Sequence, residues 1–418
     1  GGFGSEPKFP NASILRFVNH LYRTSGEKFY AAMLTKTLDG MSGGQVWDNS
    51  DGGFFRHCAQ ADWGQPQLEK MVEDNLGLAR EFLDAGILLD RSQYRETARR
   101  IINYMMEQLY DPAAPGFRGS QGAHSDYFAL SPDQRTDEAQ PAPDPSCYAN
   151  SNGLAVTVLL DAAWKLGDST LQTTALQVLE RLDSMAQTGS FSHVYSEQGP
   201  LDAPALFTDW AWLLTALMQA HGNTANESYL ERAVAVAQIM MERFFDQDGG
   251  GFYDIEEQSE AIGHLQIREK TLIDNTVAAQ ALVRLHQSTR NEDYRQVAEA
   301  ALSVFVDTFR EQGEFAADYG LAVHLLKNDM VEVTVEGRPE DPGCQKLLAA
   351  ASRLSQPNLD IKTVVAADGD NIARAHVCLD TVCLPPVDSP AELADAVAGL
   401  TQQQENPFQD IFQVFPGN

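Results

Sequence analysis

Residues 52–87 read GGFFRHCAQADWGQPQLEKMVEDNLGLAREFLDAGI and carry the pattern that decides the fold. The stretch opens on Gly52-Gly53-Phe54, where glycine permits the left-handed backbone that ends a helix and the phenylalanine can pack under the turn. It then passes Asp74-Asn75-Leu76 into an amphipathic segment. Apolar residues recur in that segment at helical spacing: Ala79, Phe82, Leu83 and Gly86. The stretch therefore predicts the end of one helix pair and the start of the next.

Both elements recur along the chain, and the glycine–phenylalanine element does so at intervals of about 60 to 75 residues. The glycine–phenylalanine element is found at Gly52-Gly53-Phe54, Gly116-Phe117, Gly189-Ser190-Phe191, Gly250-Gly251-Phe252 and Gly313-Glu314-Phe315. The polar element is found at Asp74-Asn75-Leu76, Asn152-Gly153-Leu154, Asp209-Trp210-Ala211, Asp274-Asn275-Thr276 and Asp318-Tyr319-Gly320. A period of this length equals two helices with their loops, and it predicts helix pairs that bury one another's apolar faces.

Ten helices are predicted from this pattern, at residues 11–23, 27–41, 67–87, 91–109, 150–166, 168–185, 204–221, 226–245, 273–288 and 291–310. Long polar loops containing aromatic residues separate the pairs. Such loops favour a closed (α/α)6 toroid with a pocket at its mouth over an open solenoid. A twelfth helix is not apparent after residues 316–327, so an incomplete ring, or one that borrows another segment, stays open.

The pattern changes near residue 330. Strand-like alternation occurs at 331–335, 360–365 and 373–378, with helices expected at 341–354 and 389–400. We therefore expect a mainly α fold: a helical barrel over residues 1–328, a small C-terminal α/β subdomain over 329–402 and a loosely held tail over 403–418.

Charge and composition exclude some partners. The 418 residues include 59 acidic and 30 basic side chains, for a net charge of −29. Because nucleic acid binding depends on neutralising phosphates, nucleic acid is not an expected partner. No apolar run is long enough for membrane insertion. Five cysteines are too few and too odd for a secreted disulfide framework, which favours a soluble, cytoplasmic protein, although a targeting segment could precede Gly1.

Several loop motifs resemble a known family. They are Gly1-Gly2-Phe3-Gly4-Ser5-Glu6-Pro7-Lys8-Phe9-Pro10, Gly52-Gly53-Phe54-Phe55-Arg56, Pro66-Gln67-Leu68-Glu69-Lys70-Met71, Met240-Met241-Glu242-Arg243-Phe244-Phe245-Asp246 and Asn275-Thr276-Val277-Ala278-Ala279. Together they resemble the spermatogenesis-associated protein 20 family, the YyaL-like thioredoxin-domain proteins. The resemblance implies an N-terminal thioredoxin-like domain, which is absent from this chain, followed by a six-hairpin barrel like those of glycosidases and sugar 2-epimerases.

The chain departs from that family pattern at three places. Gln67 replaces a histidine, Gly122-Ala123-His124-Ser125 replaces Asp-Ala-Asp-Ser, and Ser151 replaces a tryptophan before Asn152. A carboxamide cannot exchange a proton near neutral pH as an imidazole does. These losses indicate an alternative in which the barrel is catalytically degenerate.

A glycosidase needs two carboxyl groups flanking the glycosidic oxygen. The candidate catalytic carboxyl groups are Glu69, Asp74, Asp209 and Asp274, with Asp48 and Asp62 at the same inferred rim. Each could instead cap a helix or form an ion pair. The candidate ligand-binding residues are Trp47, Arg56, His57, Trp63, Gln67, Lys70, Asn75, Asn152, Trp210, Tyr253 and Asn275. Trp210 and Trp212 lie two positions apart, so they cannot both face the cavity.

Other chemistry has weaker support. An epimerase would use bases such as His57, His124, His193 or His264, but no pair is evident in the sequence. Cys378 and Cys383 have four intervening residues and fit a tight turn, with or without a disulfide, rather than a redox motif. We expect no metal site and no cofactor, because neither a zinc-ligand spacing nor a nucleotide motif is present.

Three functions remain open from the sequence. The first is a sugar- or polyol-binding barrel that processes carbohydrate, as a hydrolase or an epimerase. The second is a non-catalytic binding or scaffold protein that engages a protein partner. The third is part of a thioredoxin-domain redox protein.

Overall fold

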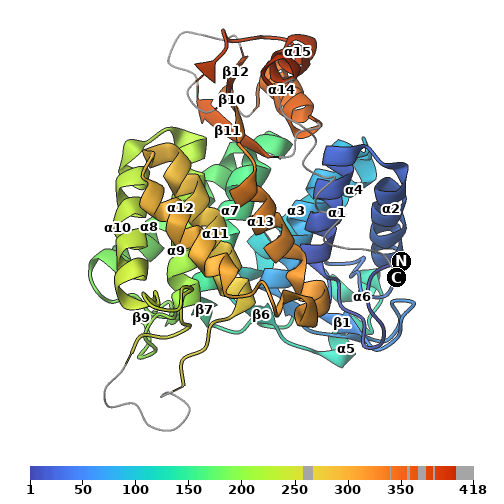
Figure 1. The fold of residues 1–418 in the computed structure, drawn as a ribbon. Coiled ribbons are helices and arrows are strands. Elements are labelled where there is room, and N and C mark those ends of the chain that lie inside the picture. The colour runs from blue at the N-terminus through green and yellow to red at the C-terminus, as the bar shows by residue number, and fades with distance from the viewer. Residues whose placement is uncertain (258–266, 339, 355–357, 366–372, 380–381, 402–418) are drawn as a thin grey trace.

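Six inner helices form a closed ring in the computed structural model, which describes residues 1–257, 267–338, 340–354, 358–365, 373–379 and 382–401. Each inner helix packs against the next, and the sixth packs against the first. In ring order they are α1 (Ala12–Ser25), α3 (Val72–Leu88), α7 (Ala149–Leu166), α9 (Phe207–Thr224), α11 (Leu272–Thr289) and α13 (Ala317–Lys327). The closure confirms the predicted (α/α)6 toroid and excludes an open solenoid (Figure 1).

Outer helices return the chain from the end of one inner helix to the start of the next. They are α2 (Lys28–Ser42), α4 (Ser92–Tyr104), α8 (Ser169–Gln187), α10 (Glu227–Arg243) and α12 (Glu292–Ser303). In the part of the chain that the structure describes, no outer helix follows α13, which leads directly into a strand. The inner ring is nevertheless complete, because α13 contacts both α11 and α1.

The predicted helices are confirmed, with shifts at some ends. Helix α3 begins at Val72 rather than residue 67, because the preceding residues pair as strands: β2 (Pro66–Gln67) with β1 (His57–Cys58), and β3 (Lys70–Met71) with β6 (Ser120–Gln121). The helix predicted at 91–109 ends in a π-helical turn, η1 (Met105–Leu109). Beyond α12 the chain forms short turns and a 3₁₀ segment, η3 (Phe309–Ala316).

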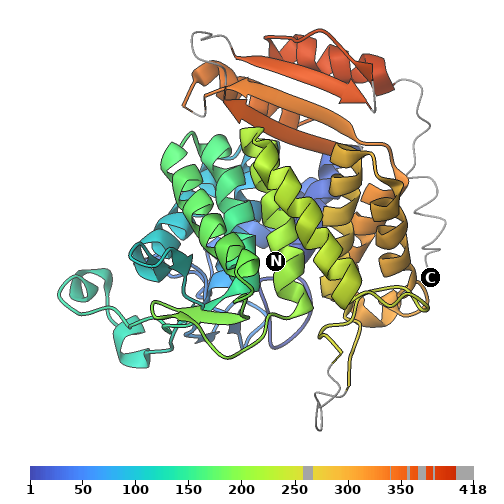
Figure 2. The ribbon, with the colours of Figure 1, turned by 90° about the vertical axis from the view of Figure 1, so that its left-hand side faces the viewer.

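The loops between hairpins gather at one end of the ring, opposite the C-terminal subdomain (Figures 1 and 2). Their remaining short elements are β4 (Tyr110–Asp111), β5 (Gly116–Phe117), α5 (Ser125–Phe128), α6 (Pro132–Arg135), β7 (Cys147–Tyr148), β8 (Val194–Ser196) and β9 (Gly199–Pro200). The first turns of the inner helices lie at this end, which we call the rim. The rim is thus formed by the loops and by the N-terminal ends of α1, α3, α7, α9, α11 and α13.

Apolar side chains fill the space between inner and outer helices, as expected for a helical barrel. Neighbouring inner helices also approach closely. A Cβ atom on Gly153 in α7 would lie 2.8 Å from the Cβ of Trp212 in α9, so this crossing requires glycine. None of the described helices combines the length and apolar character needed to cross a membrane.

The C-terminal α/β subdomain is confirmed as a four-stranded sheet in the order β11-β10-β12-β13, with two helices. Its elements are β10 (Val331–Gly337), α14 (Pro342–Ser352), β11 (Leu359–Val365), β12 (Arg374–Leu379), β13 (Val382–Cys383) and α15 (Pro390–Thr401). Strand β10 is parallel to β11 and antiparallel to β12. The predicted tail at 403–418 lies outside the described residues.

The subdomain covers the C-terminal ends of the inner helices (Figure 1). Strand β11 packs on α9, and α14 packs on α3 and α7. Polar side chains of the subdomain donate to carbonyl groups near the helix ends: Arg353 Nε to Ile87 O at 2.8 Å and Gln345 to Trp164 O. These contacts add a further donor to carbonyl oxygens at the helix ends, each of which also accepts from a backbone N–H just beyond the helix.

Candidate functional site

Three of the predicted ligand-binding asparagines occupy equivalent buried positions at the rim. Asn75 accepts a hydrogen bond from Phe54 N at 2.7 Å and donates to Phe54 O at 3.0 Å. Asn152 makes the same pair of bonds with Phe117, and Asn275 makes it with Phe252. All three side chains are fully buried. Each amide therefore joins a glycine–phenylalanine loop to the next inner helix, which explains why the two elements recur together in the sequence.

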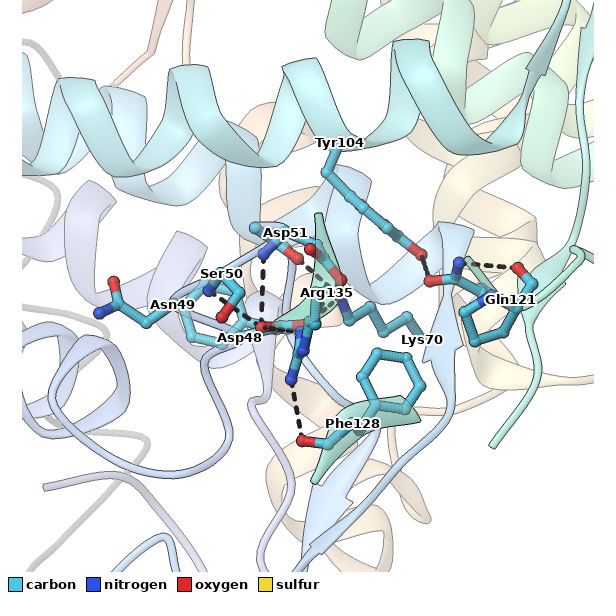
Figure 3. Close-up of polar contacts among 12 residues, drawn as sticks. Asp48, Asn49, Ser50, Asp51, Lys70, Tyr104, Gln121, Phe128 and Arg135 are labelled. Carbon is cyan, nitrogen blue, oxygen red and sulfur yellow. Dashed lines mark hydrogen bonds and ion pairs between the residues drawn. The ribbon is translucent and has the colours of Figure 1, made fainter. Parts of the chain in front are cut away.

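A buried ion pair reinforces the first of these joints (Figure 3). Lys70 Nζ donates to Asp48 Oδ2 at 2.8 Å and to Gly52 O at 2.7 Å, and Arg135 contacts the same carboxylate at 2.9 Å. Although burial opposes the effect, the neighbouring Lys70 and Arg135 lower the pKa of Asp48. The Lys70 ammonium also lies 4.4 Å from the ring centroid of Tyr104. The structure thus places Lys70 inside a sealed structural cluster.

The fifth hairpin repeats this arrangement. Lys270 Nζ donates to Asp246 Oδ2 at 2.7 Å and to Gly250 O. Tyr253 donates its hydroxyl proton to Asp246 at 3.0 Å, and its ring packs under Arg268 at 4.1 Å. Tyr253 therefore braces a loop.

The predicted tryptophans pack in the core. Trp47 packs against Phe54 with the rings tilted by 50°, Trp63 lies under the Lys8 ammonium at 4.7 Å, and Trp210 meets Phe191 edge to face. The expectation that Trp210 and Trp212 face different directions is confirmed, since Trp212 packs against Gly153 of the neighbouring inner helix.

Two predicted residues lie on the β1–β2 hairpin, away from the buried cluster. His57 stacks on Phe9 at 4.7 Å between ring centroids, and Gln67 is exposed. Asp274 accepts a hydrogen bond from Thr271 Oγ1 at 2.6 Å while its backbone N–H donates to the same oxygen. Asp274 therefore takes part in capping α11, the alternative that the sequence left open.

The remaining predicted carboxyl groups gather where α3, α7 and α9 begin. Glu69 forms an ion pair with Arg56 at 3.0 Å. Asp74, in the first turn of α3, has no hydrogen bond or ion pair with any described residue. Burial, followed by repulsion from Glu73, raises the pKa of Asp74 to about 6; Glu69 adds to this effect and Arg56 opposes it. A carboxyl group with this pKa can hold a proton in weakly acidic solution and donate it.

An imidazole–carboxylate pair lies beside this group. His193 Nδ1 is 3.0 Å from both oxygens of Asp209, which is fully buried and accepts from the backbone N–H groups of Asn150 and Leu206. The hydrogen bond to Asp209 raises the pKa of His193, although burial opposes it, and Glu73 contributes further. Because the charge of Glu73 acts on both Asp74 and His193, the two groups share one acidic neighbourhood. We call Glu69, Glu73, Asp74, His193 and Asp209 the rim cluster.

Sequence reasoning missed one member of the rim cluster, Glu73, and one contact to it, and it named His193 only as one of several possible epimerase bases. Glu73 directly precedes Asp74 in the recurring polar element, and His193 follows the element at Gly189-Ser190-Phe191, so position within the repeat was the available signal. Ser151, which stands where the family pattern has tryptophan, donates a hydrogen bond to Glu73 at 2.5 Å. The small side chain thus leaves room for a polar contact between α7 and α3.

Comparison with known proteins agrees with this architecture. The sequence profile of glycosyl hydrolase family 76 matches residues 93–318. Human spermatogenesis-associated protein 20 is 21% identical over 94% of this chain and 66% of its own length, and an uncharacterized protein of Caenorhabditis elegans is 22% identical over 94% and 70%. The chain spans about two thirds of the length of these curated relatives.

Solved structures share the fold at low sequence identity. A sugar epimerase from a ruminal bacterium superposes with a TM-score of 0.59 and 12% identity over 73% of this chain and 80% of the epimerase. A D-mannose isomerase gives 0.58 and 12% over the same shares. A family 76 α-mannanase of Bacteroides thetaiotaomicron gives 0.51 and 11%, over 70% of this chain and 72% of the mannanase. With its closed ring of six inner helices and the matched profile covering more than half of its length, the chain belongs to glycosyl hydrolase family 76 and is a relative of spermatogenesis-associated protein 20.

Proposed function

We propose that this chain is a carbohydrate-processing enzyme that hydrolyses a glycosidic bond at the rim cluster. The observation that carries the proposal is Asp74, whose carboxyl group has a pKa of about 6 among other acidic side chains. Glycoside hydrolysis requires one protonated and one charged carboxyl group near the scissile bond. The membership in family 76 and the likeness to an α-mannanase support an α-mannoside as substrate.

Three members of the rim cluster have a role in this reaction. Asp74 donates its proton to the leaving-group oxygen as the glycosidic bond breaks. Glu69, held by Arg56 at 3.0 Å, supplies the second carboxylate, which stabilises the positive charge that develops on the sugar. A water molecule then adds to the anomeric carbon and returns a proton to the Asp74 carboxylate. Glu73 contributes by keeping the pKa of Asp74 raised.

One observation favours a second reaction at the same cluster. His193, oriented by Asp209, is an imidazole suited to accept a proton from the carbon next to a sugar carbonyl. Asp74 would then protonate the carbonyl oxygen, giving an enediol. Return of a proton to the neighbouring carbon would complete isomerisation, and return to the same carbon from the opposite face would complete epimerisation. The D-mannose isomerase and the sugar epimerase with this fold support that possibility.

The test is to incubate the purified chain with α-mannan oligosaccharides, D-mannose and cellobiose, and to measure released reducing sugar and converted sugar separately. Asp74→Asn is expected to lower kcat by at least about 100-fold, because an amide cannot donate the proton. Asp274→Asn is the matched control, since it changes the same residue type in the first turn of another inner helix and should leave kcat within about twofold, because an asparagine oxygen can still accept the capping hydrogen bond.

The outcomes separate the functions. Hydrolysis that survives Asp74→Asn at the wild-type rate would remove Asp74 from the reaction. If the chain converts D-mannose or cellobiose but hydrolyses none of the substrates, and if His193→Gln abolishes the conversion, the isomerase or epimerase reaction is supported in place of the hydrolase reaction. Sugar binding with no turnover of any of these substrates would contradict both reactions and support the non-catalytic binding protein.

A further inference from the structure

A polar cavity lies at the end of the ring opposite the rim cluster. It has a volume of about 290 Å³ and is enclosed by side chains of all six inner helices and by α14 and β11 of the subdomain. Ligand pockets in proteins start at roughly this size, about 300 Å³, which suits a monosaccharide-sized molecule. We call it the capped cavity.

Basic side chains crowd the capped cavity although the whole chain is strongly acidic. Its lining includes five basic residues: Arg16, Arg23, Arg80, Lys165 and Arg284. The acidic residues of the lining are Glu81, Asp84, Asp161 and Asp360. Three of these acids are already engaged, because Glu81 pairs with Arg80 at 2.9 Å and Lys165 bridges Asp84 and Asp161.

Two arginines of the cavity have no carboxylate partner among the described residues. Arg284 makes no ion pair there, and its buried Nε atom has no hydrogen-bond partner. Arg23 donates to His20 Nδ1 at 3.2 Å, an uncharged contact because burial, and then the charge of Arg23, lower the pKa of His20. Both side chains are half-buried, and a cation partly removed from water without a counterion costs free energy. The cavity therefore favours an added negative charge.

The arginines also repel one another. Arg16 is held by Gln280 at 3.1 Å and only weakly by Asp318 at 3.4 Å. Burial, followed by the charge of Arg80, lowers the pKa of Arg16, with Arg284 adding to the effect. Three guanidinium groups thus share one low-dielectric space, and an anion bound between them would relieve the repulsion while accepting charge-assisted hydrogen bonds.

Amide side chains complete the lining next to the arginines. Gln219 and Asn223 lie on α9, and Asn19 on α1 has a buried Oδ1 atom without a partner. Amide groups both donate to and accept from hydroxyl groups. A ligand that carries hydroxyl groups beside its negative charge fits this lining better than a bare ion.

We propose that the capped cavity binds a small polyhydroxylated anion, a sugar acid or a sugar phosphate, with Arg16, Arg80 and Arg284 around its negative group. This site is separate from the rim cluster and does not depend on the reaction proposed there. Neither the catalytic role of Asp74 nor the identity of its substrate enters the argument.

Isothermal titration calorimetry of the full chain tests the proposal with four probes: D-glucuronate, D-glucose 6-phosphate, inorganic phosphate and D-glucose. We expect at least one of the two sugar anions to bind at least tenfold more tightly than D-glucose, and their relative affinities tell a carboxylate from a phosphate ligand. Arg284→Gln should weaken that binding about tenfold, the size of one lost charged hydrogen bond. Arg99→Gln, on the exposed face of α4, is the matched control and should not change it.

Thermal unfolding of Arg284→Gln first establishes that the variant is folded, which is expected because no ion pair is broken. Asp74→Asn should bind the anion as tightly as wild type, so loss of turnover at the rim and loss of binding in the cavity are distinguishable. Equal affinities for D-glucose and both sugar anions, or undiminished binding by Arg284→Gln, would overturn the proposal. Inorganic phosphate binding as tightly as D-glucose 6-phosphate would overturn its polyhydroxyl part.

Discussion

The two ends of the helical ring carry opposite chemistry. Carboxyl groups collect at the rim and guanidinium groups collect under the subdomain. Among the described residues, Asp74 forms no ion pair at the first end and Arg284 forms none at the second. All six inner helices run in the same direction, so their N-terminal ends converge at the rim and their C-terminal ends converge at the capped cavity. Helix dipoles favour anions at the first end and cations at the second. The direction of the helices thus accounts for the carboxyl groups in the first turns of α3, α9 and α11. Arg16, Arg80 and Arg284 lie before the last turns of their helices, so closure of the ring, not the dipoles, brings them together.

The largest expected effect comes from removing the cation that joins two acids of the capped cavity. Lys165→Met leaves the half-buried Asp84 and Asp161 without their shared partner, and we expect a loss of about 1.5–3 kcal/mol in the free energy of unfolding at pH 7, the size of a charged hydrogen bond. Urea denaturation measures it. The control is Lys327→Met, which breaks an exposed ion pair with Glu299 and should cost at most about 1 kcal/mol.

The pH dependence of this variant has a defined sign. Burial raises the pKa of Asp161 even in the wild-type protein, where Lys165 opposes the shift. Without Lys165 the folded state binds a proton more readily than the unfolded state, so stability should recover as the pH falls from 7 toward 5. If the two lysine variants lose the same free energy of unfolding at every pH, then Asp84 and Asp161 do not depend on Lys165 for compensation of their charge.

At the rim, by contrast, we expect a substitution that stabilises the protein at pH 7. Glu73→Gln removes a like charge beside Asp74, keeps an oxygen that can accept from Ser151, and should lower the pKa of Asp74 from about 6. Because Asp74 acts in its protonated form, the alkaline limb of the pH–kcat profile should move to lower pH. NMR titration of the Asp74 carboxyl carbon measures the same shift directly.

Stability should change in the same experiment. A folded-state pKa above the usual value means that stability falls as the pH rises from about 4 through 6. Glu73→Gln makes this loss smaller and should stabilise the protein at pH 7 by about 0.5 kcal/mol. Glu96→Gln, on the exposed face of α4, is the control. An unchanged alkaline limb would exclude Glu73 as the group that sets the pKa of Asp74.

The smallest effect on turnover and on anion affinity is expected from the disulfide between Cys378 and Cys383, which settles the choice that the sequence left open. It closes a short hairpin between β12 and β13, at the sheet edge opposite the strand that packs on the ring. Cys378→Ser should destabilise the subdomain by about 2 kcal/mol at most, and change both rim turnover and anion affinity by less than twofold. Differential scanning calorimetry with both assays measures this; a large loss of anion affinity would show that the far edge of the sheet supports the cavity.

The sequence predicted the ring because the same residues that mark the repeat also build it. Asn75 and its counterparts bind the loop that precedes each inner helix, so their spacing reports the architecture directly. Their recurrence was equally compatible with a pocket, and only burial distinguishes the two. Trp47 and Trp63 are predicted to line the pocket because they lie in loops, yet both are large apolar groups that the core accommodates.

The sequence does not predict the capped cavity, and the reason is a different one. Helix α3 carries Gly77, Arg80, Glu81 and Asp84 along one narrow stripe at spacings of three and four. A polar stripe on a helix ordinarily faces solvent, and its spacing is identical when it faces the inside of a ring. The stripe lies on a helix that is otherwise buried on every side, and this surplus of apolar positions is the signal that could have located the cavity.

Among the described residues no outer helix follows α13, and this determines which end of the ring the C-terminal subdomain covers. An inner helix ends on the side away from the loops, so a chain that leaves the ring there must build its next unit on that side. One additional return helix would have carried β10 to β13 around to the loop side, over Asp74 and its neighbours. With no sixth outer helix among the described residues, the chain keeps its subdomain off the rim cluster and uses α14 and β11 as the floor of the capped cavity.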